Sequence, residues 1–101
     1  MGTRLLIEVH YKVKEGLRDE FLQKVKEAGI AEETRKESGN GRYEFLYPAS
    51  VSDQLVLLEI WDTAEDQEKH TKTAHYKKLF ELKEQYVVDT EVQKSMFEHM
   101  N

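Results

Sequence analysis

The chain has 101 residues, of which 35% are charged and 39% hydrophobic, and its formal net charge is -5. This length suits a single domain over residues 1–101 with a core of modest size. The acidic balance argues against nucleic-acid and anionic-membrane binding, because both need a basic patch.

The chain contains no cysteine, which excludes disulfides, thiolate chemistry and cysteine-ligated zinc. No apolar run approaches the roughly 18 residues that a membrane span needs, and we find no signal-peptide core. We therefore expect a cytoplasmic protein that does not interact with membranes.

The first half of the chain predicts a strand, an interrupted helix and a second strand. Residues 5–13 alternate between apolar and mixed positions, which is typical of a strand with one buried face. From Leu17 the apolar spacing becomes helical, and Gly29 predicts a kink in that helix. The glycines at 39 and 41 suit a turn with positive φ, and residues 42–47 predict the second strand.

The second half predicts a strand, two helical pieces and a weak last strand. The strand at residues 54–61 has Leu55, Leu57, Glu59 and Trp61 on one face, because strand side chains alternate. Thr63, with Asp66 three residues later, predicts the capped start of a short helix that delivers His70. A longer amphipathic helix follows, then a turn at 88–90 and a strand at 91–97.

This order of elements is typical of an α+β, ferredoxin-like βαββαβ fold with helices on one face of the sheet. The other face carries apolar residues that would be exposed in a monomer; with one histidine, this set is Leu6, His10, Leu46, Val56, Leu58 and Ile60. Two sheets stacked face to face would bury this set, so we expect a homodimer.

Glu59 and His70 are the predicted catalytic residues. An acid on the helix-facing side of a middle strand must be paired, solvated in a cavity or protonated. We expect His70 to be its partner, because a carboxylate beside an imidazole fixes one tautomer and raises the basicity of the ring. The alternatives are a salt bridge from Glu59 to a helix lysine and a purely structural His70.

Four further residues are candidates for substrate binding. Trp61 and Tyr43 fit either a packed core or the wall of a pocket for a planar ligand. Tyr76 can donate a hydrogen bond to a substrate oxygen. His75 fits either a pocket or a helix cap; five residues from His70, it would lie about 140° round a single helix, so we expect no metal site.

Four stretches of the sequence resemble the antibiotic biosynthesis monooxygenase family: KVKEGLRDEF, KESGNGRYEF, LLEIW and EKHTKTAHYKKL. The resemblance implies a dimeric α/β-barrel of ferredoxin-like protomers, with a pocket between sheet and helices. The family includes cofactor-independent quinol monooxygenases, and the HTKTAHYK run resembles the related isomerase of phosphorylated autoinducer-2. Haem-degrading relatives use a strand asparagine, which would fall near Val9, and a haem-ligating histidine, which would fall near Phe80. This chain has neither, so we expect no cofactor.

Three functions fit these observations. The first is a cofactor-independent monooxygenase of a small phenol or quinol, with His70 as base, Glu59 as its orienting group and aromatic residues around the ring. The second is an isomerase of a small phosphorylated metabolite, in which His75 and Lys72 hold anionic oxygens. The third is a dimer that binds a small molecule without catalysis.

Overall fold

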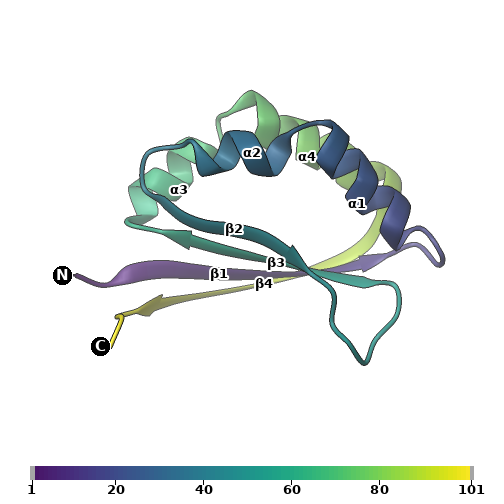
Figure 1. The fold of residues 1–101 in the computed structure, drawn as a ribbon, viewed down its shortest axis with the longest axis horizontal. Helices are drawn as coiled ribbons and strands as arrows, with labels where there is room; N and C mark the ends of the chain where they lie inside the picture. Colours follow the sequence, from purple (N-terminus) through teal and green to yellow (C-terminus); the bar gives the residue numbers. More distant parts are fainter. Residues whose placement is uncertain (1, 101) are drawn as a thin grey trace.

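The computed structural model describes residues 2–100, which form a four-stranded antiparallel sheet with helices on one face (Figure 1). The elements in chain order are β1 (Arg4–Val13), α1 (Arg18–Glu27), α2 (Ile30–Arg35), β2 (Asn40–Leu46), β3 (Gln54–Trp61), α3 (Ala64–His70), α4 (Ala74–Tyr86) and β4 (Val87–Phe97). The strands lie in the order β2-β3-β1-β4. This arrangement is the predicted ferredoxin-like α+β fold.

Alternation along the two middle strands puts one row of side chains under the helices. On β3 the residues Leu55, Leu57, Glu59 and Trp61 are all buried, as the alternation predicted. The register continues this pattern across the sheet, because Glu59 lies opposite both Tyr43 of β2 and Ile7 of β1. Burial of the apolar members of this face supplies most of the driving force for folding.

The helical layer follows the predicted breaks. Gly29 has a φ of +67° and separates α1 from α2. The predicted kink is therefore a break between two helices. The Thr63 hydroxyl accepts a hydrogen bond from the Asp66 backbone N–H at the start of α3. Thr73 does the same at the start of α4, so His75 is not the cap of that helix.

The prediction of a turn at residues 88–90 was wrong. β4 begins at Val87, directly after α4, and it pairs with β1 as far as Phe97, with one irregularity that leaves Val88 out of the register. The Lys14 N–H donates to the Tyr86 carbonyl at 2.8 Å and fixes the junction between α4 and β4. Backbone pairing with β1 therefore keeps a polar segment extended although its own sequence favours a turn.

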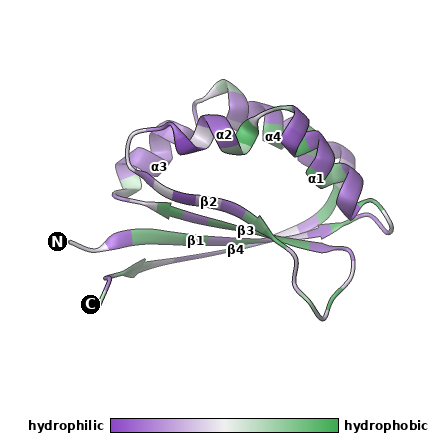
Figure 2. Cartoon of the chain, in the orientation of Figure 1, coloured by the Kyte–Doolittle hydropathy of each residue, from purple (hydrophilic) through white to green (hydrophobic). Residues whose placement is uncertain are grey.

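Residues on the face of the sheet away from the helices are half-buried or exposed. Figure 2 shows apolar residues along β1, whereas polar residues cover much of the helical layer. Leu6, Leu58 and Ile60 are only partly buried on this outer face, and Leu46 is 37% exposed. No helix within residues 2–100 is both long and apolar enough to cross a membrane.

Gly39→Ala should destabilise the protein more than Gly16→Ala. Both glycines have positive φ, so each alanine costs about 1–2 kcal/mol of backbone strain. At Gly39 an added Cβ would also lie 2.9 Å from the Asp66 Cβ, whereas nothing lies within 4 Å at Gly16. Urea unfolding should show a difference of more than about 1 kcal/mol between the two variants. Equal losses would contradict this packing of the α2–β2 turn against α3.

Candidate functional site

A cavity of about 160 Å³ lies between the sheet and the helices α3 and α4. Its walls combine apolar side chains, three tyrosines and five polar or charged side chains. The lining comprises Ile7, Val9, Tyr11, Tyr43, Leu57, Glu59, Gln67, His70, Tyr76, Leu79, Phe80, Lys83, Val92 and Lys94. An apolar hollow with a few convergent polar groups is the usual form of a small-molecule site.

His70 is the last residue of α3, and it is buried against aromatic rings. Its ring centroid lies 4.9 Å from that of Trp61 and 5.2 Å from that of Tyr76. Only 2% of the residue is exposed. Its backbone is also held, because the Thr73 hydroxyl donates to the His70 carbonyl at 2.8 Å. The imidazole therefore has one well-defined position at the cavity wall.

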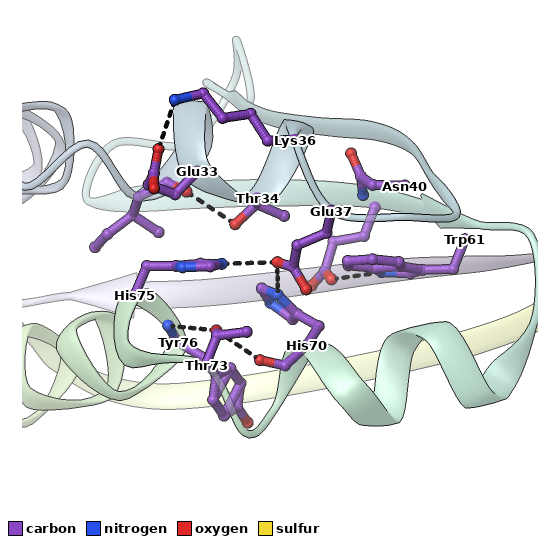
Figure 3. A network of polar contacts seen from close by, with 12 residues as sticks. Glu33, Thr34, Lys36, Glu37, Asn40, Trp61, His70, Thr73, His75 and Tyr76 are labelled. Carbon is purple, nitrogen blue, oxygen red and sulfur yellow. Dashed lines mark hydrogen bonds and ion pairs between the residues drawn. The ribbon is translucent and has the colours of Figure 1, made fainter.

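The carboxylate that contacts His70 is Glu37, not Glu59 as the sequence had led us to expect. Glu37 Oε2 lies 2.6 Å from His70 Nδ1 and 2.7 Å from His75 Nε2 (Figure 3). Glu37 follows α2, in the turn that leads into β2, and its side chain reaches both imidazoles from above the sheet. A residue outside the predicted set therefore makes the contact to His70 that was predicted for Glu59.

This contact selects one form of the His70 ring. A carboxylate oxygen only accepts hydrogen bonds, so Nδ1 carries a proton and donates it to Glu37. In the neutral ring Nε2 is then the nitrogen with the free lone pair. Among residues 2–100, no hydrogen-bond partner of Nε2 is seen. The side chain at the cavity wall can therefore accept a proton from a bound molecule.

Glu59 has a different partner and a different chemistry. Its Oε1 accepts a hydrogen bond from Trp61 Nε1 at 3.0 Å, and the residue is 7% exposed. Burial raises the pKa of this carboxyl above its ordinary value of 4.5, and the Trp61 hydrogen bond and nearby His70 oppose that rise. The Glu59 carboxyl therefore binds its proton more tightly than a free glutamate does.

Two lysines bring positive charge to the same cavity. Lys94 of β4 lies opposite Ile7, so Tyr43, Glu59, Ile7 and Lys94 form one row across the four strands. Lys83 of α4 lies with its Nζ 5.3 Å from the Tyr11 ring centroid, and burial lowers its pKa below 10.5. Lys83 is partly buried, whereas Lys94 is exposed, so a bound anion would meet one partly desolvated ammonium group and one that contacts solvent.

The Tyr43 hydroxyl is buried and has no hydrogen-bond partner among residues 2–100. The tyrosine is 1% exposed and lines the cavity, and burial raises its pKa well above 10. The nearby Thr34 hydroxyl donates instead to the Ile30 carbonyl at 2.8 Å. A buried hydroxyl without a partner is costly, so this packing position carries an energetic penalty within the fold.

The structure brings together four of the six predicted site residues at the cavity: Glu59, His70, Tyr43 and Tyr76. Trp61 is fully buried beside them and contacts His70 and Glu59 rather than the hollow. His75 contacts Glu37 on the far side of His70 and does not line the cavity. Lys72, considered for anion binding, does not line it either.

Sequence reasoning missed Glu37 and the two lysines. One signal for Glu37 was available: it is an acid at the C-terminal end of a helix, where the helix dipole disfavours a negative charge. Such an acid needs donors from elsewhere, and the two histidines supply them. Lys94 gave no signal, since the strand that carries it is mostly exposed and polar.

Comparisons with known proteins agree with the fold and indicate a family. Residues 4–82 match the family model described as antibiotic biosynthesis monooxygenase. No curated protein sequence matches the chain. Many solved structures match, and three of them share 16–23% sequence identity with it and therefore support the fold alone.

The first of these is a Pseudomonas aeruginosa protein, with a TM-score of 0.86, 16% identity and 98% of each chain covered. A Bacteroides thetaiotaomicron protein described as a possible oxidoreductase has a TM-score of 0.83 and 23% identity, with 96% of this chain and 100% of that chain covered. A Nitrosomonas europaea protein, described as a candidate antibiotic biosynthesis monooxygenase, has a TM-score of 0.83 and 22% identity, with 99% of this chain and 93% of that chain covered. With the family model matched over residues 4–82, the chain belongs to the antibiotic biosynthesis monooxygenase family.

Proposed function

We propose that this protein is a cofactor-independent monooxygenase of a small, single-ring phenol or quinol. One observation carries the proposal: His70 is buried at the wall of an apolar cavity, and Glu37 holds its Nδ1 so that Nε2 is free to accept a proton. Family membership supports the same class of reaction.

The size and walls of the cavity support a substrate with one ring. Its volume is about 160 Å³, and an engineered apolar cavity of about 150 Å³ binds benzene. Leu57, Leu79 and Val9 supply apolar walls, and the side chains of Tyr43 and Tyr76 also line the cavity. Apolar walls also exclude water from a reactive anion.

In the proposed reaction, His70 Nε2 takes the proton of a substrate hydroxyl. The resulting anion is electron-rich enough to reduce oxygen directly. For a substrate RH2 the balance is RH2 + O2 → RO + H2O, so the substrate supplies all the electrons and no external reductant is needed. Lys83 and Lys94 would stabilise the anion by their charge, and Glu59, with its raised pKa, would supply or hold a proton.

The second candidate is an isomerase of a small phosphorylated metabolite. The two cavity lysines favour it, because they would attract a phosphate group. The same His70 would move a proton between neighbouring carbons. NMR distinguishes this function from oxygen consumption. An isomerase should exchange hydrogen of a sugar phosphate for deuterium in deuterated buffer. If neither reaction occurs and a quinol still raises the melting temperature, a binding role is favoured.

The outer face of the sheet supports a homodimer of this chain. Leu6, Leu58 and Ile60 lie on the middle strands and are only half-buried by their own chain. A second copy presenting the same face would cover them symmetrically, as isologous interfaces do. The helices and the cavity lie on the opposite face, so both sites would stay open to substrate.

His70→Ala should abolish most oxygen uptake. Loss of a general base typically costs about 10²- to 10⁴-fold in rate. The measurement is oxygen consumption with a panel of single-ring hydroquinones, with His99→Ala as the control because His99 is exposed in the C-terminal tail. The proposal fails if the wild-type protein consumes no oxygen with any substrate, or if both variants retain the same rate.

Glu37→Gln should lower kcat and leave KM nearly unchanged. The glutamine preserves the size of the side chain but can present its NH2 group to His70, which would favour the wrong tautomer. The loss should be smaller than that of His70→Ala, because the base itself remains. A large rise in KM with unchanged kcat would contradict an orienting role for Glu37.

Glu59→Gln should stabilise the protein at neutral pH and remove part of its pH dependence. Because burial raises the pKa of Glu59, the folded state binds this proton more tightly than the unfolded chain. The free energy of unfolding of the wild type should therefore fall as pH rises from about 4.5 through the folded pKa. Urea unfolding at pH 4.5 and pH 7 should show a gain for the variant only at pH 7. A loss at pH 7 would contradict the prediction.

Leu58→Glu should convert the dimer into monomers. An unpaired buried charge costs several kcal/mol in an apolar interface. Light scattering after gel filtration should give twice the chain mass of 11.9 kDa for the wild type and for Lys78→Glu, a charge change on the exposed surface of α4. A wild-type monomer at micromolar concentration would remove the dimer from the proposal.

A further inference from the structure

We propose that Glu37, His70 and His75 form a binding site for one divalent transition-metal ion. This inference goes beyond the proposed monooxygenase, and its test requires no substrate. It departs from the expectation of no metal site, which rested on the spacing that the two histidines would have on a single helix. His70 ends α3 and His75 lies in the first turn of α4, so that spacing does not apply.

The ligand atoms converge from three segments of the chain. Glu37 Oε2, His70 Nδ1 and His75 Nε2 all lie within 4.8 Å of one another. Both imidazole nitrogens point at the same carboxylate oxygen, at 2.6 and 2.7 Å (Figure 3). Around a tetrahedral zinc ion with bonds of about 2.0–2.1 Å, ligand atoms lie about 3.3 Å apart. Small side-chain movements would therefore open the hydrogen-bonded cluster enough to admit the ion.

The backbone around each ligand is already fixed. The Glu37 N–H donates to the Thr34 carbonyl, and the Glu37 carbonyl accepts from the Asn40 N–H. Thr73 bridges the two helices, because its hydroxyl donates to the His70 carbonyl and accepts from the Tyr76 N–H. A site whose ligands are held before binding loses little conformational entropy when the ion arrives.

The charge balance favours a cation between these groups. Within residues 2–100, neither a lysine nor an arginine pairs with Glu37, and the two histidines are its only side-chain partners. The side chains of Glu37 and His75 are each 16% exposed, whereas that of His70 is 3% exposed. The cluster is therefore open to water on the side of His75, which gives an entry path and room for a water ligand.

The donor set selects the class of ion. Two imidazoles and one carboxylate suit zinc, nickel, copper or iron(II), whereas magnesium and calcium prefer oxygen ligands. Binding through His70 Nδ1 would leave the ring proton on Nε2. An occupied site would therefore present a donor to the cavity in place of the acceptor that the monooxygenase proposal requires.

The test is calorimetric titration of the tag-free, chelator-treated protein with zinc chloride. We expect one ion per chain. Loss of a residue that only hydrogen-bonds to a metal ligand weakens binding by roughly 10- to 100-fold. Glu37→Gln and His75→Gln each remove a ligand itself, so each should weaken binding by more than that. His99→Gln is the matched control, because it removes an exposed histidine of the tail and should bind as the wild type does.

A second measurement uses the unmodified chain, so it does not depend on the folding of the variants. Zinc should shift the imidazole nitrogen resonances of His70 and His75 at one equivalent, and leave those of His10 and His99 unchanged. The proposal is overturned if no saturable binding occurs, if His75→Gln binds as tightly as His99→Gln, or if the shifts fall on His10 or His99. These outcomes leave the oxygen-uptake prediction untouched.

Discussion

The contact on which the site depends is one carboxylate oxygen shared by two imidazoles. Glu37 Oε2 joins the turn after α2 to the end of α3 and the start of α4, and its two partners lie 33 and 38 residues away along the chain. It fixes the tautomer of His70, and the ring of Trp61 fixes its tilt from the other side. Without this contact, the nitrogen that faces the cavity would not be defined.

The sheet provides the floor of the cavity. The row of Tyr43, Glu59, Ile7 and Lys94 crosses all four strands and forms the floor beneath His70. Alternation along each strand guarantees that these side chains point the same way. The floor combines an acid with a raised pKa and a lysine that is exposed on the edge strand, and apolar side chains of β1, β3 and α4 lie beside them. A bound anion would meet a positive charge here.

The two proposals assign His70 two roles that exclude each other. As a base it would accept a proton at Nε2, which needs Glu37 to accept the hydrogen bond from Nδ1–H. As a metal ligand at Nδ1 it would carry its proton on Nε2. An ion in the cluster would therefore block the proposed base function of His70.

Local sequence patterns determined the order of elements, the buried face of β3, the break at Gly29 and the capped start of α3, because each depends on neighbouring residues alone. They also singled out Glu59 and His70. Only the tertiary structure decided that Glu37 is the partner of His70, since 33 residues separate them and no periodicity connects a turn to a distant helix end. The same holds for β4, where pairing with β1 overrides the preference of Val88 to Thr90 for a turn. Contacts between distant segments are set by how the layers pack, and a linear pattern carries no record of that packing.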